Sequence, residues 1–184
     1  MEVFKAGLII IAAALSACAG AVVLKAAGGT AYYCGQVSFF SPDGTLPYGN
    51  TDSALKREVL DGGARIIETV TQPGAGHSMR AVETVTELKR RKKTLVYDAS
   101  AAGGTVTGTV TFKDAELKTW TYALKLKAGG TIKGSGILDA KGIKIEKQLS
   151  GGGRPMSVKE DLKTVPERRY TMSVNAMRPP GGAE

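Results

Sequence analysis

Few side chains in this sequence have the chemistry and the spacing of a catalytic centre. His77 is the only histidine among 184 residues, and it lies in the glycine-rich segment 74–78. A general base or a metal ligand needs partner residues, and besides scattered carboxylates the chain offers only the thiols of Cys18 and Cys34. The Gly-x-Ser-x-Gly and His-Glu-x-x-His motifs are missing. We therefore expect no enzyme activity, no metal site and no cofactor, and interpret His77 as a surface or loop residue.

Two charged residues, Lys147 and Glu160, occupy positions where the pattern calls for apolar side chains. Lys147 continues an alternation of apolar residues that begins at Ile143, and Glu160 interrupts one that begins at Val158. The glycine-rich turn between the two segments makes them antiparallel neighbours, which brings the two charges opposite or diagonal to each other on one face. Buried charges are tolerated when they pair. The pair predicts a polar anchor for the headgroup of a ligand in an apolar cavity; the alternative is that these positions lie near an open barrel rim or face solvent.

The strongest charge feature is a run of five basic residues between two predicted strands. In such a turn the side chains would be exposed and could contact lipid phosphates, lipopolysaccharide or acidic glycans. The alternative is a solvated turn that keeps the end of a hairpin soluble. The run comprises Lys89, Arg90, Arg91, Lys92 and Lys93.

Large aromatic residues recur on the faces that are expected to point inward. They predict the lining of a ligand cavity, and the alternative is that they only fill a core. The predicted lining comprises Trp120, Tyr122 and Phe112, with Tyr97, Tyr170 and Met172 on similar faces.

The N-terminus has the layout of a secretory signal, with one lysine, Lys5, an apolar run from Ala6 to Leu15, and small residues after it. The segment Leu15-Ser16-Ala17-Cys18 resembles the lipobox of bacterial lipoproteins. This resemblance implies cleavage before Cys18, a lipid on its thiol and an exported domain. Because Ala19 and not aspartate follows the cysteine, it also implies sorting to the outer membrane, on its periplasmic side or surface.

Two other outcomes remain open for this segment. No charged residue occurs from Ala6 to Leu24, which is long enough for an uncleaved helical anchor. Cleavage after Ala19 would instead release a soluble protein. With a lipid on Cys18, Cys34 would be a lone thiol in an oxidising space.

The rest of the chain alternates with the period of β-strands. Residues 105–112 and 118–127 alternate cleanly between apolar and polar side chains. Short turns such as Asp61-Gly62-Gly63 and Ala140-Lys141-Gly142 separate the predicted strands. About ten strands and no long helix follow the anchor, with the first strand expected at 36–40, a loop at 41–53 and the last strand at 169–177. We predict an all-β, antiparallel up-and-down meander that closes into a barrel; a two-sheet sandwich is the alternative.

Three segments of the predicted meander resemble the lipocalin-like, or calycin, barrels. They are Lys56–Gly63, Gly134–Asp139 and Arg169–Val174. The Gly-x-Trp motif that opens the lipocalin family proper is absent, and the single Trp120 lies in the middle of a strand. The resemblance therefore implies a fold class and transfers no binding site.

These patterns divide the chain into a signal peptide (1–17), a lipidated tether (18–35), a barrel domain (36–178) and a disordered tail (179–184). The formal net charge of +8 fits a lysine-rich soluble surface or an acidic partner, and an exported domain is not expected to bind nucleic acid. We expect a membrane-anchored protein that binds a small hydrophobic or amphipathic ligand inside the barrel. The alternative is a structural or interaction protein of the cell envelope that uses its basic surface and has no cavity.

Overall fold

The computed structural model describes residues 29–60, 62–73, 79–92, 94–101, 104–114, 117–151 and 155–178. Several predictions fall outside these residues: the signal segment with Cys18, the uncleaved anchor, His77, Lys93 and the tail from Pro179.

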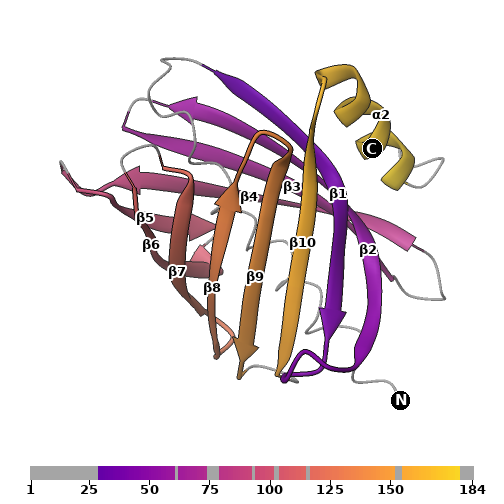
Figure 1. Cartoon of the computed structure of the whole chain (residues 1–184), viewed down its shortest axis with the longest axis horizontal. Coiled ribbons are helices and arrows are strands. Elements are labelled where there is room, and N and C mark those ends of the chain that lie inside the picture. The colour runs from indigo at the N-terminus through magenta and orange to yellow at the C-terminus, as the bar shows by residue number, and fades with distance from the viewer. Residues whose placement is uncertain are drawn as a thin grey trace.

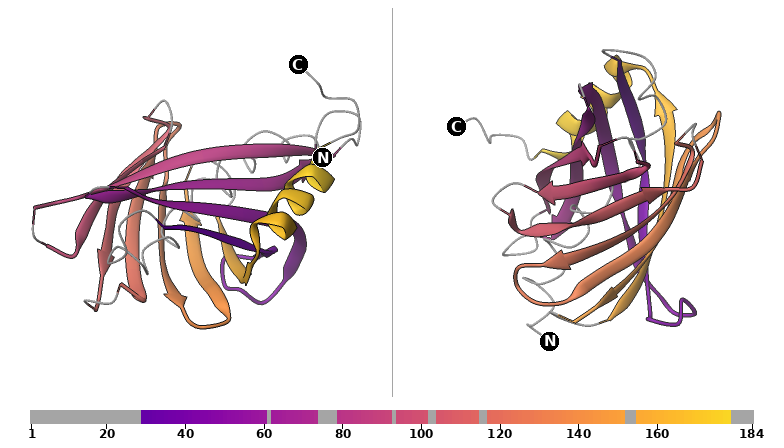
Figure 2. Two further views of the ribbon diagram at one scale, coloured as in Figure 1. Left: turned by 90° about the horizontal axis from the view of Figure 1, so that it is seen from above. Right: turned by 90° about the vertical axis from the view of Figure 1, so that its left-hand side faces the viewer.

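Ten antiparallel strands form one closed barrel (Figures 1 and 2). Each strand pairs with its neighbours in the sequence, and β1 closes the barrel by pairing with β10. The strands are β1 (Thr30–Phe40), β2 (Pro47–Leu60), β3 (Gly63–Pro73), β4 (Met79–Arg90), β5 (Val96–Ala101), β6 (Val106–Phe112), β7 (Thr119–Leu126), β8 (Thr131–Leu138), β9 (Gly142–Ser150) and β10 (Met156–Val165).

The closed barrel confirms the predicted all-β meander and excludes the sandwich. Two boundaries were wrong. β1 begins at Thr30, so residues 30–35, expected to end the tether, pair within the barrel. β2 begins at Pro47, inside the segment 41–53 that was expected to be a loop. Its turn-forming composition is overridden because Gly49, Asn50 and Thr51 find partners on β1.

The predicted last strand at 169–177 is instead a helix, α2 (Glu167–Met177). Tyr170, Met172 and Val174 fit a strand, but Tyr170, Val174 and Met177 fit a helical face equally well. The helix forms because β1 already closes the barrel against β10 and leaves no free edge for another strand. Tyr170 and Met172 therefore do not point into the barrel, and Met172 is 63% exposed.

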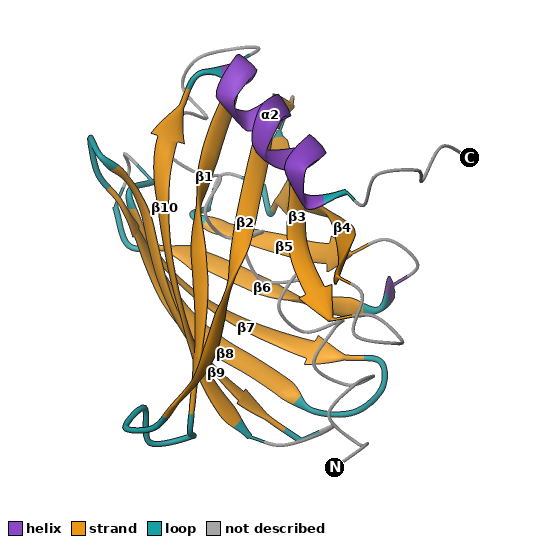
Figure 3. Cartoon of the chain, turned by 90° about the vertical axis from the view of Figure 1, so that its right-hand side faces the viewer, coloured by secondary structure: helices purple, strands orange, loops and turns teal. Residues whose placement is uncertain are grey.

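Helix α2 lies across the outer surface of β1, β2, β3 and β4 (Figure 3). Its buried face packs on the small residue Ala54 of β2 through Val174 and Met177, and Cys34, Ala81 and Tyr170 border this contact. None of the helices in the described part of the chain is long and apolar enough to cross a membrane.

Candidate binding site

The aromatic residues predicted to line a cavity form one wall of the barrel interior. Trp120 and Tyr122 on β7 lie directly opposite Gly136 and Gly134 on β8. A Cβ atom added to Gly136 would overlap the indole of Trp120, and one added to Gly134 would overlap the phenol of Tyr122. The two glycines therefore provide the space in which the aromatic rings lie across the neighbouring strand.

These rings are packed against other side chains. The ring centroid of Phe112 lies 5.3 Å from that of Tyr97, and these two rings meet edge to face. The centroids of Phe112 and Trp120 are 6.1 Å apart. Trp120 is 0% exposed, Phe112 3% and Tyr122 4%. An internal space large enough to hold a water molecule would leave part of the adjoining side chain accessible. The indole of Trp120 is fully covered, so no such space adjoins it.

Lys147 and Glu160 form an ion pair inside the barrel, on the neighbouring strands β9 and β10. Glu160 lies directly opposite Ile145 on β9, so the two charges are diagonal neighbours, as the turn predicted. Both side chains are 0% exposed, which excludes the alternative that they face solvent. Their role as an anchor for a ligand headgroup stays a prediction.

Sequence reasoning missed a second group of buried polar residues on β2 and β3. Arg57 is 2% exposed and Glu68 1%, and the register makes them diagonal neighbours on the inward face. The Ser53 hydroxyl donates a hydrogen bond to Glu68 Oε1 at 3.0 Å. Burial lowers the pKa of Arg57, and burial raises the pKa of Tyr33 while the nearby Arg57 opposes that rise.

A signal for this group was present in the sequence. Arg57 lies two residues after Leu55, and Glu68 lies midway between Ile66 and Val70. This is the same phase argument that found Glu160. It was obscured in β2 because Lys56, Arg57 and Glu58 are consecutive charges, which resemble an exposed segment.

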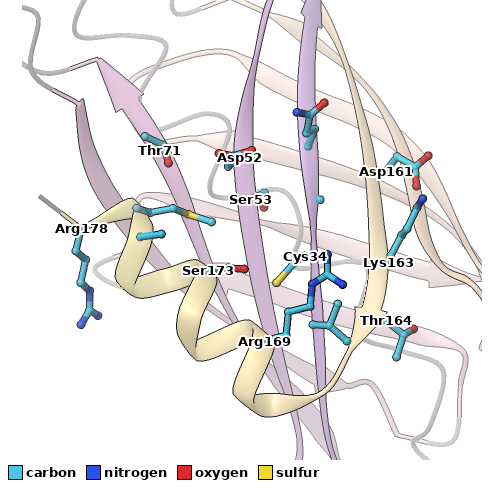
Figure 4. Close-up of a pocket in the computed structure, with 15 residues that line it drawn as sticks. Cys34, Asp52, Ser53, Thr71, Asp161, Lys163, Thr164, Arg169, Ser173 and Arg178 are labelled. Atoms are coloured by element: carbon cyan, nitrogen blue, oxygen red, sulfur yellow. The ribbon is translucent and has the colours of Figure 1, made fainter.

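Outside the barrel, a groove of about 1250 Å³ runs between α2 and the outer surface of the adjoining strands (Figure 4). Its charged lining has both signs, and the thiol of Cys34 lies in it beside Ser173 and Arg169. Burial raises the pKa of Cys34, while Ser173 and Arg169 oppose that rise. The charged residues that line the groove are Asp52, Asp161, Lys163, Arg169 and Arg178.

The described part of the basic run, Lys89–Lys92, is exposed but only half of it is a turn. Lys89 and Arg90 are the last residues of β4 and pair with Asp98 and Tyr97 on β5, and Arg91 and Lys92 begin the turn between the two strands. We call this four-residue segment the basic turn. Arg91 donates a hydrogen bond from Nε to the Asp98 carboxylate at 2.8 Å, and Arg90 donates one from Nε to the carbonyl oxygen of Thr94, also at 2.8 Å. The two arginines thus shape the turn while their outer surfaces remain accessible.

Comparison with protein-family models, with curated proteins and with solved structures found no match to this chain. The closed antiparallel barrel is consistent with a lipocalin-like fold. The function therefore has to be argued from the geometry of the chain itself.

Proposed function

We propose that this chain is an exported interaction protein, tethered to a membrane through Cys18, that acts through its outer surface and not by catalysis. The single observation that favours action through the outer surface over an internal ligand site is the packing around Trp120. The indole and its neighbours fill the space where a ligand cavity was predicted, with exposures of 0 to 4%. A ligand would have to displace side chains that pack as a protein core does.

The tether rests on the sequence Leu15-Ser16-Ala17-Cys18 and on the apolar run before it. Mass spectrometry of the mature N-terminus tests it directly. We expect a chain that begins at Cys18 and carries acyl groups, and Cys18→Ala should release the protein from membranes while the fold is kept. An unmodified chain that keeps Met1 would favour the uncleaved anchor, and one cleaved after Ala19 would favour a released protein.

The filled interior is tested by binding of small apolar probes. In the wild-type protein, the fluorescence of Trp120 should stay unchanged when fatty acids or detergents are added below their critical micelle concentrations. Phe112→Ala opens a void beside Trp120 and serves as the matched positive control, because an engineered apolar cavity binds small apolar molecules. A fluorescence shift in wild-type protein comparable to that in Phe112→Ala would contradict the proposal.

A second candidate is binding of a small amphipathic ligand inside the barrel. The buried charges favour it, because an ion pair in a dry interior is costly to form and Lys147 or Glu160 could exchange its partner for a ligand headgroup. This candidate predicts that wild-type protein binds such a ligand and that Glu160→Leu loses the binding. Unchanged binding in Glu160→Leu would exclude the pair as its anchor.

A further inference from the structure

The position of the basic turn relative to the start of the barrel is fixed by the hydrogen-bonded register. The backbone N–H of Val59 donates to the carbonyl oxygen of Gly29 at 3.0 Å. Val59 pairs with Ala64, and Ala64 pairs with Leu88. These four residues form one row across β1, β2, β3 and β4. Three strand spacings make this row about 14 Å long. Its last residue is Leu88, and Lys89, where the basic turn begins, comes directly after it.

Helix α2 begins on the other side of β1, at the same end of the barrel. Tyr32, near the start of β1, pairs with Val165 at the end of β10, and its ring lies 5.1 Å from that of Tyr170 on α2. The first turn of this helix carries the exposed Glu167, Arg168 and Arg169, a net of one positive charge. The first described residues of the chain therefore lie between the basic turn and the start of α2.

The positive charge at one end of the barrel is concentrated in the basic turn. We call the end at which β1 begins the N-terminal end; in Figure 1 β1 begins at the upper left, and the loop between β1 and β2 lies at the bottom. In the full sequence, the segments that connect strands at the N-terminal end carry six basic and four acidic residues, a net of two positive charges, and those at the opposite end carry Lys127, Arg154 and Asp43, a net of one. Three of the six basic residues belong to the basic run, and the other three are outnumbered by the four acidic residues.

We propose that the N-terminal end of the barrel faces the membrane and that the basic turn contacts the phosphates of anionic phospholipids. The inference rests on the proposed tether, because a lipid on Cys18 leaves only ten residues between the anchored cysteine and Gly29. The tether keeps the basic turn near the bilayer, where basic side chains are attracted to an anionic surface. The contact then sets the orientation of the barrel, and the loop between β1 and β2 points away from the bilayer.

The experiment measures which end of the barrel lies closer to the lipid. Full-length protein carrying Cys34→Ser is purified from its membrane and reconstituted into phosphatidylcholine vesicles, with or without phosphatidylglycerol. A dye is attached at Ala140→Cys or at Ala128→Cys, and energy transfer to an acceptor-labelled lipid is recorded. These two exposed alanines are matched, because they lie in the turns at opposite ends of β8.

We expect higher transfer from position 140 than from position 128, with an excess that grows when phosphatidylglycerol is present. Raising the salt concentration should reduce this growth, since exposed charges are screened. Arg90→Gln combined with Lys92→Gln should abolish the growth. Lys125→Gln combined with Lys127→Gln removes the same charge near the opposite end and should leave it intact.

Each other outcome overturns a defined claim. Protein that washes off phosphatidylcholine vesicles lacks a membrane anchor, which overturns the tether and this inference with it. Protein that is retained but shows equal transfer from both positions, or the same excess after neutralisation of the basic turn, overturns the inference alone. An excess that appears only with added lipopolysaccharide assigns the basic turn to that glycolipid and overturns the contact with phospholipid.

Discussion

Two lysine–glutamate pairs on the same two strands show how strongly the face of a barrel changes the value of a charge. Lys147 and Glu160 point inward from β9 and β10, and both side chains are 0% exposed. Glu146 and Lys159 point outward from these strands, with their charged atoms 3.6 Å apart and side chains 71% and 53% exposed. The residue types are the same, and only the phase of the alternation differs.

The inward pair is shielded from water, so each charge depends on the groups buried around it, including the other charge of the pair. Removing one partner of a buried pair is strongly destabilising, whereas replacing both can be neutral. The outward pair is solvated and screened, and such pairs contribute little to stability. The comparison teaches that a charge in a β-strand has to be assigned to a face before its role can be judged.

The largest expected effect breaks the inward pair. Glu160→Leu should destabilise the fold by about 3–5 kcal/mol, because Lys147 stays buried after it has lost the Glu160 carboxylate. Glu146→Gln, the matched change in the outward pair, should cost about 0.5 kcal/mol. Urea denaturation with an unchanged m-value measures both.

The double variant Lys147→Met with Glu160→Leu completes this test. It should recover most of the lost stability, since both charges of the buried pair are replaced by apolar side chains. Equal effects of Glu160→Leu and Glu146→Gln would show that the inward pair is solvated, contrary to its 0% exposure.

The next effect tests the two faces of one strand with uncharged residues. Gly136→Val on the inward face of β8 should destabilise by about 3 kcal/mol, because its side chain would overlap the Trp120 indole. Ser135→Val on the exposed outward face should change stability by less than about 0.5 kcal/mol. Thermal unfolding followed by tryptophan fluorescence distinguishes them, and similar midpoints for both variants would contradict the packing of Trp120.

A smaller effect extends the comparison to the two faces of α2. Met177→Ala should cost about 2 kcal/mol, because Met177 is buried against the barrel. Met172→Ala should stay within about 0.5 kcal/mol of wild type, because Met172 is exposed. If this segment were a strand with Met172 facing inward, the order of the two effects would be reversed.

The smallest effect concerns the exposed ion pair between Arg91 of the basic turn and Asp98 of β5. The hydrogen bond from Arg91 lowers the pKa of Asp98 below its ordinary value. A carboxyl whose pKa is lower in the folded state stabilises the fold above its unfolded pKa of about 3.9, and that contribution is lost as the pH falls through the folded value. Arg91→Gln should raise the pKa of Asp98 in an NMR titration and leave stability at pH 7 almost unchanged. An unshifted pKa would show that the two groups do not pair in solution.

The sequence by itself determined the class of the fold and part of its interior. A period of two over most of the chain, with short turns between segments, predicts an antiparallel meander because neighbouring strands pair most readily. The same phase argument placed Lys147 and Glu160 on one face, where the ion pair confirms them. Residues 143–149 and 156–162 alternate cleanly, so the face of each side chain could be assigned.

Tertiary structure decided what local patterns left ambiguous. The segment 169–177 fits both a strand and a helix, and it became α2 because closure of β1 on β10 leaves no edge to extend. Pro47–Thr51 has the composition of a loop and became part of β2 because β1 offers it partners. Pairing with distant residues outweighs local preference at both places.

The placement of the basic turn also depends on the closed sheet. The sequence predicts an exposed basic run, but the distance between that run and the start of the barrel follows only from the row Gly29, Val59, Ala64 and Leu88. The packing around Trp120 likewise depends on how rings from β6 and β7 meet the glycines of β8. Both are relations between residues that are distant in the sequence, and the register of the closed barrel sets them.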